Sequence, residues 1–270
     1  MNTIDTRQPG AEPYFSICVP QYNRTPHLIE SILWISRQSM RDVEICISDD
    51  RSTDGLQSEL LSALHACGLP FVYLLQERNQ RYDGNLRSAV DLSRGRFCIL
   101  LGNDDRFNSV DELQLLRAEI EAHEKVGVVI TNYVEIASGH LMRRIPETAN
   151  RGAGPAVAAH NFRHYSFVSG IVLHGGQARA LSTSKWDGSE MYQMYLGSSI
   201  IAQGYSLLGV SRAVIAKDIQ IPGEVVDSYS RKPVLNPCPI IERKHTFHLL
   251  APLTTDAIRP YCTDPELATL

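Results

Sequence analysis

Short runs of apolar residues alternate with amphipathic segments along the first half of the chain. The runs are rich in Val, Ile, Leu and Phe and end in polar or turn-forming residues, which is typical of buried strands. Five of them predict strands over residues 14–19, 43–48, 71–75, 97–101 and 127–131. Strands separated by helical patterns predict βαβ units, and therefore an α/β fold with a mostly parallel sheet flanked by helices.

The segments between the runs carry helix signals. Thr25 and Pro26 are favourable residues for the start of the first helix. After the third run, the polar residues 80–85 predict a loop, followed by a short helix from Leu86 onward.

The regular order weakens beyond residue 131. Residues 139–159 are rich in Gly, Ala and Pro, which predicts a long loop. The remaining patterns predict a strand over 167–173, a helix over 191–203 and strands over 206–210 and 213–216.

The two ends of the chain differ from its middle. Residues 1–12 are polar and include Pro9-Gly10, which predicts a flexible leader. Residues 222–270 carry spaced prolines, which predicts a wrapping C-terminal arm. Such an arm is compatible with contact to a membrane or to a partner subunit, and the oligomeric state stays open.

The composition excludes several classes of protein. Of the 270 residues, 43% are hydrophobic and 21% are charged, as in a globular protein of one large domain or two modest ones. A net charge of -4 argues against a nucleic-acid-binding protein, which usually has a basic excess. No apolar run approaches the roughly 18 residues that cross a bilayer, and the N-terminus lacks the apolar stretch of a signal peptide. These features predict a cytoplasmic protein, with any membrane contact peripheral and at the inner face.

Two of the predicted strands end in paired carboxylates. Asp49-Asp50 follows the second run, and Asp104-Asp105 follows the fourth. Because parallel strands open onto the same edge of a sheet, both pairs are expected there. One pair can accept hydrogen bonds from a base or ribose, and the other can hold Mg²⁺ or Mn²⁺ against a diphosphate. For the second pair, a solvated turn is the plain alternative, since Asp is common in turns.

Glycine-rich phosphate loops are missing from the sequence. No Gly-x-Gly-x-x-Gly or Walker pattern occurs, which disfavours a dinucleotide-binding fold and a P-loop NTPase. Phosphates would then be neutralised by a metal and by basic side chains.

The order of these segments resembles the family 2 glycosyltransferases of GT-A fold. The matching pieces are residues 16–24, 42–55, 77–85 and 95–105, in the family's order and spacing. The likeness is greatest to enzymes of bacterial surface-polysaccharide assembly, abequosyltransferase-like enzymes included.

The resemblance implies a GT-A fold: a Rossmann-like, mostly parallel sheet flanked by helices, with an acceptor-side extension and the C-terminal arm. Residues 13–107 would form the half that binds the nucleotide sugar. Residues 108–221 would form the acceptor-binding half of the same domain.

The resemblance also implies roles for residues of the donor half. Pro20, Tyr22 and Arg24 would flank the donor nucleotide, and Asp50 would accept a hydrogen bond from its base.

The fourth run supplies the implied metal site. Asp104 would be the principal ligand of Mg²⁺ or Mn²⁺, with Asp105 beside it. Gly102 stands where relatives usually have the first acid of this motif, and Asn103 fills the next, donor-binding place.

A second departure lies after the third run. Arg81 stands where glycine is usual, so Arg81 or Arg87 is expected to face a phosphate of the donor. The plain alternative for either arginine is a solvated surface side chain.

The implied reaction is inverting, metal-assisted transfer of a sugar from a nucleotide-diphosphate sugar to the hydroxyl of a carbohydrate, lipid-linked or other acceptor. A base takes the proton of that hydroxyl. The candidates are Glu190 and Asp187, because Glu190 aligns with the Glu-Asp pair of the family while Met191 replaces the second member. The plain alternative for Glu190 is an acid that favours a helix N-terminus.

Two other functions fit parts of the pattern. A sugar nucleotidyltransferase shares a related sheet, but its glycine-rich signature is missing near the first strand. A catalytically degenerate GT-A protein that binds a nucleotide sugar or a partner is the alternative that Gly102 motivates.

Overall fold

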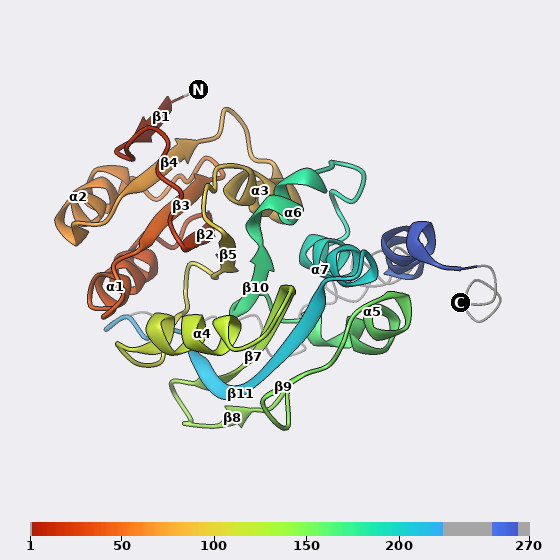
Figure 1. The fold of residues 1–270 in the computed structure, drawn as a ribbon. Helices are drawn as coiled ribbons and strands as arrows, with labels where there is room; N and C mark the ends of the chain where they lie inside the picture. The colour runs from red at the N-terminus through yellow and green to blue at the C-terminus, as the bar shows by residue number, and fades with distance from the viewer. Residues whose placement is uncertain (1, 224–249, 264–270) are drawn as a thin grey trace, which may run out of the picture.

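The strands predicted from the apolar runs form the middle of one sheet, with helices on both of its faces (Figure 1). The computed structural model describes residues 2–223 and 250–263. The strands are β1 (Asn2–Asp5), β2 (Phe15–Gln21), β3 (Val43–Asp49), β4 (Phe71–Leu75), β5 (Phe97–Leu100), β6 (Arg106–Phe107), β7 (Val126–Glu135), β8 (Leu141–Met142), β9 (Ala149–Asn150), β10 (Ile171–His174) and β11 (Ser206–Lys217). The α-helices are α1 (Thr25–Ser36), α2 (Gln57–Cys67), α3 (Arg81–Asp91), α4 (Glu112–Glu121), α5 (Pro155–Asn161), α6 (Gly175–Ala180) and α7 (Tyr192–Ala202), with a further helix over 250–258 and short 3-10 turns at Phe162–Tyr165 and Arg259–Tyr261.

The central strands are parallel, as the alternation of strands and helices predicts. The sheet order is β1-β4-β3-β2-β5-β10-β7-β11-β6. Strands β4, β3, β2 and β5 run parallel to one another, and β7 runs parallel to β11. Strand β10 lies antiparallel between β5 and β7, so it joins the two parallel groups into one sheet.

The sheet is buried on both faces, which explains why its strands read as continuous apolar runs. Helices α1, α2 and α4 pack on one face, and α3, α5, α6 and α7 pack on the other (Figure 1). Along β2, Ile17 and Val19 lie in one core and Cys18 in the other, as the two-residue period of a strand requires.

Several sequence predictions differ from the observed elements. Residues 139–159 do not form one long loop, since they contain β8, β9 and the start of α5. The segment 80–85 is not a loop, because α3 begins at Arg81 and only Gln80 precedes it. Asp83 and Asn85 are buried against polar groups, so the first turn of this helix has no apolar period. Strand β10 begins only at Ile171, since Gly170 has φ +79°. The two strands expected over 206–216 are one, β11, with irregular register between Val210 and Ala213.

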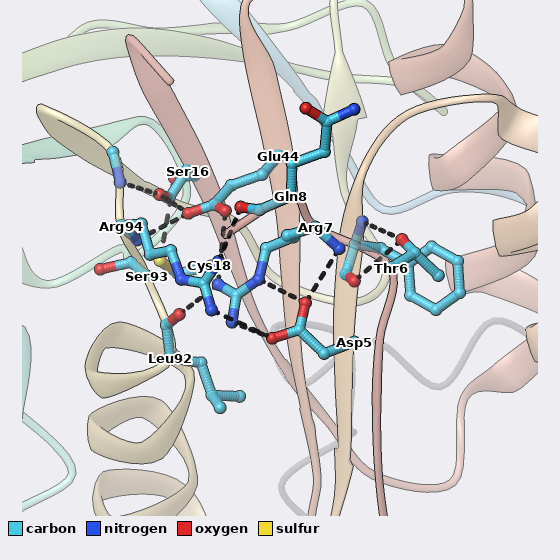
Figure 2. Close-up of polar contacts among 12 residues, drawn as sticks. Asp5, Thr6, Arg7, Gln8, Ser16, Cys18, Glu44, Leu92, Ser93 and Arg94 are labelled. Atoms are coloured by element: carbon cyan, nitrogen blue, oxygen red, sulfur yellow. Dashed lines mark hydrogen bonds and ion pairs between the residues drawn. The ribbon is translucent and has the colours of Figure 1, made fainter. Parts of the chain in front are cut away.

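The prediction of a flexible leader is wrong for residues 2–7. Strand β1 pairs antiparallel with β4 at the sheet edge. The guanidinium of Arg7 pairs with the carboxylate of Asp5 at 2.7 Å and with that of Glu44 at 3.3 Å. Figure 2 shows how these side chains lie. Glu44 is 2% exposed, so this ion pair is buried within the protein. Backbone pairing and a buried ion pair hold the segment, and neither gives an apolar pattern in the sequence.

The C-terminal arm lies largely outside the described residues. In its described part, Leu253, Ala257 and Ile258 of the helix over 250–258 are fully buried in the core beneath α7. No helix in the two described stretches has both the length and the apolar character needed to cross a bilayer.

Candidate active site

A pocket of about 460 Å³ opens where β2, β3 and β5 end. Its wall combines the turn after β2, the residue after β3, the start of α3, the turn after β5 and one residue before β10. The lining residues are Pro20, Tyr22, Arg24, Asp50, Asn79, Arg81, Tyr82, Asn85, Gly102, Asn103, Asp104 and Val168. Seven of the predicted site residues are therefore brought together by the fold.

Only one acid of the first pair faces this pocket. Asp50 lies on its wall, and its Oδ1 accepts a hydrogen bond from the N–H of Gln80. Burial raises the pKa of Asp50, and the N–H groups that point at it oppose this rise. Asp49 turns the other way, where its carboxylate accepts from the hydroxyl of Tyr73 (2.8 Å) and the N–H of Ser52 (2.7 Å).

The second pair divides in the same manner. Asp104 lies on the pocket wall with 25% of its side chain exposed. Asp105 is 2% exposed and does not line the pocket. Its Oδ2 accepts from the Ser169 hydroxyl at 2.5 Å, and its Oδ1 accepts from the N–H of Asp218 at 3.0 Å. The geometry therefore does not place Asp105 beside Asp104 as a ligand, contrary to the expectation from the sequence.

The environment of Asp105 also disfavours a charged ligand. Burial, together with the neighbouring charge of Asp104, raises the pKa of Asp105 to about 8. At neutral pH the group is thus largely a neutral acid that supports the turn after β5.

Two arginines bring positive charge to the pocket. Arg24 follows β2 and pairs with the carboxylate of Asp104. Arg81 opens α3 with φ +60°, an uncommon conformation for a residue other than glycine. This conformation accompanies the replacement of the usual glycine and leaves Arg81 on the pocket wall.

Arg87 and the two candidate bases lie outside the pocket wall. The guanidinium of Arg87 pairs with Asp187 at 2.6 Å, so it does not face a phosphate in this arrangement. Glu190 is exposed, has φ +58° and lies in the loop that precedes α7. Its N–H donates to Asp83 at 2.7 Å, and Asp83 is the chain neighbour of the pocket-wall residue Tyr82, so the backbone of Glu190 lies close to that wall.

Sequence reasoning missed four lining residues: Asn79, Tyr82, Asn85 and Val168. Asn85 is 3% exposed; its amide donates to the Gln21 carbonyl at 3.0 Å, and its Oδ1 has no hydrogen-bond partner among the described residues. Tyr82 and Asn85 could have been predicted from the sequence, because residues three apart at the start of a helix lie on the same face of it. Val168 has no such signal, since only the packing of β10 brings it to the pocket.

The pocket residues fit a divalent cation that one protein carboxylate shares with phosphate oxygens. Asp104 is the exposed carboxylate at the end of β5, and magnesium in phosphate sites is commonly held by one or two carboxylates plus the substrate. Within the described residues, no three His, Cys, Asp or Glu side chains gather into a complete metal site. The protein thus offers a partial set of ligands, which phosphate and water would complete.

The position that lacks the usual acid is crowded. A Cβ at Gly102 would lie 3.0 Å from Asp105 Oδ2, 3.1 Å from Ser169 Oγ and 3.2 Å from Asp104 Oδ1. A side chain at this position would require these neighbours to move by a few tenths of an ångström, so their close approach favours glycine.

Gly102→Asp is expected to destabilise the protein by about 1–3 kcal/mol and to reduce turnover, because it adds both volume and a third carboxylate. Urea denaturation and a turnover assay measure the two effects. Gly102→Ala, which adds the Cβ without the charge, separates them. A Gly102→Asp variant with higher activity and full stability would contradict this account.

Comparison with known proteins identifies the class. Residues 16–174 match the sequence model described as Glycosyl transferase family 2. The chain is 26% identical over 236 residues to the abequosyltransferase RfbV of Salmonella typhimurium, an alignment covering 80% of this chain and 68% of that protein. S. aureus TarS 1–349 in complex with UDP has a similar fold, with a TM-score of 0.62 and 16% identity, covering 76% of this chain and 60% of that one. A mannosyltransferase from Pyrobaculum calidifontis in complex with GDP-Man and Mn²⁺ is also similar (TM-score 0.56, 16% identity, 97% and 79% covered).

The fold is that of the GT-A glycosyltransferases. The chain belongs to glycosyl transferase family 2. The predicted family, the α/β fold class and the enzyme class, glycosyltransferase, are confirmed. The family does not favour the sugar nucleotidyltransferase alternative.

Proposed function

We propose that the protein transfers a sugar from a nucleotide-diphosphate sugar to a hydroxyl of a carbohydrate or lipid-linked acceptor, with inversion at the anomeric carbon. The supporting observation is that Asp50 and Asp104, which are 54 residues apart in the sequence, line one pocket together with Arg24 and Arg81. A pocket with carboxylates and guanidinium groups at the ends of parallel strands suits a ligand with a hydrogen-bonding base and a diphosphate.

The donor half would bind the nucleotide through residues of three strand ends. Asp50 would accept from a base N–H, and Pro20 and Tyr22 would flank the base. Arg81 would pair with a phosphate in a fork geometry that suits this group. Asn103, whose amide donates to Gln21 Oε1 at 2.7 Å, would form part of the floor beneath the donor.

Asp104 would hold the divalent cation, Mg²⁺ or Mn²⁺, against the diphosphate. A bound cation would stabilise the negative charge of the departing nucleoside diphosphate. Arg24 now neutralises Asp104, so it would be displaced toward the phosphates when donor and cation bind. The pocket thereby keeps its charge balanced in both states.

Residues of the second half would bind the acceptor and supply the base. Glu190 would take the proton of the acceptor hydroxyl. The acceptor oxygen would then form a bond to the anomeric carbon as the bond from that carbon to the diphosphate breaks on the opposite face. Asp187 would remain paired with Arg87.

Nucleotide sugars that differ in their base test this proposal. Thermal shift is measured with UDP-, GDP-, CDP- and dTDP-sugars, each with and without Mn²⁺, and release of nucleoside diphosphate reports slow transfer to water. At least one nucleotide is expected to raise the melting temperature in a metal-dependent manner. If none does, the proposed transferase activity fails; binding without any turnover would instead indicate a degenerate member of the family.

A further inference from the structure

The loop that carries both candidate bases is attached to one stripe of helix α3. Asp83, Arg87 and Asp91 are spaced by four residues, so they lie on one face of the helix. Arg87 pairs with Asp187 at 2.6 Å, and Asp91 accepts from the hydroxyl of Ser182 at 2.9 Å. The stripe therefore contacts the loop along its length.

Asp83 makes the densest of these contacts: it accepts hydrogen bonds from three main-chain N–H groups and, at 3.4 Å, from the Ser189 hydroxyl. Its Oδ2 accepts from Gly188 at 2.8 Å and from Glu190 at 2.7 Å. Its Oδ1 accepts from Tyr192 at 3.1 Å. The side chain is 1% exposed, so these donors replace water around the carboxylate. A buried carboxylate with several N–H donors is a strong, charge-assisted anchor.

The anchored backbone has an unfavourable shape. Gly188 has φ +94°, and Glu190 has φ +58° although it is not glycine. At Glu190 this left-handed conformation is uncommon for a residue with a side chain and persists only when its surroundings impose it. Asp83 imposes it by binding the N–H of Glu190 itself and those on both sides of it.

The same helix begins in the donor pocket. Arg81, Tyr82 and Asn85 line that pocket, whereas Asp83 does not. The hydroxyl of Tyr82 donates to Gln193 Oε1 at 3.1 Å in α7, just beyond the loop. One rigid helix thus joins the residues around the donor to the residues around the candidate base.

We propose that Asp83 is a positioning residue: it sets the backbone at Glu190 and couples this loop to the donor pocket through α3. This inference rests on the proposed function, because it concerns the step in which the acceptor is deprotonated. It assigns to Asp83 no contact with the substrate.

The test is Asp83→Asn, with donor affinity and kcat measured separately. The amide keeps one acceptor oxygen and turns an N–H toward the loop, so the conformation at Glu190 should relax. We expect kcat to fall about 10²-fold, the effect of a misplacement near 1 Å, while the Kd for donor and metal stays within a few-fold of the wild type.

Glu44→Gln is the matched control for stability. Glu44 is another buried carboxylate; it accepts from the Arg94 N–H and the Ser16 hydroxyl, both at 2.6 Å, near the start of β3 and away from the pocket (Figure 2). This variant should lower the melting temperature but leave kcat per folded molecule unchanged. If Asp83→Asn behaves like Glu44→Gln, or if it loses donor affinity as strongly as kcat, the positioning role is overturned.

A measurement on the wild type keeps the proposal testable if Asp83→Asn does not fold. The amides of Glu190 and Tyr192 should exchange with deuterium much more slowly than in an unstructured peptide, although Glu190 is exposed. Exchange at the unstructured rate would overturn the anchor. Failure of the proposed function is recognised separately, because the wild type would then show neither nucleotide binding nor turnover.

Discussion

Replacing Asp104 with asparagine is expected to lower turnover on the order of 10³-fold, the scale of losing one strong stabiliser of transition-state charge. Asparagine keeps the size of the side chain but removes the charge that would hold a cation against the diphosphate. The stabilisation that nucleotide and Mn²⁺ produce together should disappear. Weaker, metal-independent nucleotide binding should remain, because Arg24 and Arg81 also line the pocket.

Asp105→Asn is the matched control, one residue along the chain. Asp105 lies outside the pocket wall, and with a pKa of about 8 it is largely protonated at pH 7, so asparagine is a close substitute. This variant should retain metal-dependent binding and most of its activity. Full activity in Asp104→Asn would remove Asp104 from the site, and an equal loss in both variants would point to disruption of the turn after β5.

Replacing Glu190 with glutamine is expected to lower kcat by about 10²- to 10⁴-fold, the range for losing a general base. The side chain keeps its shape, and the backbone contact to Asp83 is unaffected. Donor affinity should therefore stay near that of the wild type. Single-turnover kinetics with saturating donor separate this loss of chemistry from any loss of binding.

Asp187→Asn distinguishes the second candidate base. Both carboxylate oxygens of Asp187 face Arg87, at 3.4 and 2.6 Å, so the group is already engaged as an ion-pair partner. The two side chains are 31% and 22% exposed, and such a pair is worth about 1 kcal/mol or less. We expect a small loss of stability and a kcat within a few-fold of the wild type. If only Asp187→Asn abolishes transfer, the base is Asp187.

Apolar patterning is a reliable guide where both faces of an element are buried. Strands β2, β3, β4 and β5 match the predicted runs within two residues at each end, since burial on two sides requires continuous apolar residues. The pattern fails where polar contacts hold the chain. Strand β1 and the first turn of α3 have few apolar residues, because backbone pairing, an ion pair and pocket-facing groups stabilise them.

The two acid pairs show which features the sequence predicts and which depend on tertiary contacts. Their position after parallel strands was sufficient to predict that Asp50 and Asp104 would meet at one edge of the sheet. Which member of each pair faces the pocket depends on long-range partners. The carboxylate of Asp49 accepts a hydrogen bond from Tyr73. That of Asp105 accepts from Ser169 and Asp218, which lie 64 and 113 residues further along the chain.

The amino-acid sequence therefore determined the family, the parallel sheet and the strand ends that carry the site, because local burial patterns and motif spacing encode these features. Tertiary packing alone decided that Asp105 is a buried support, that neighbouring side chains crowd Gly102, and that Asp83 holds the loop at Glu190. Each of these results depends on groups far apart in the chain that meet within a few ångströms, and such contacts leave no local pattern.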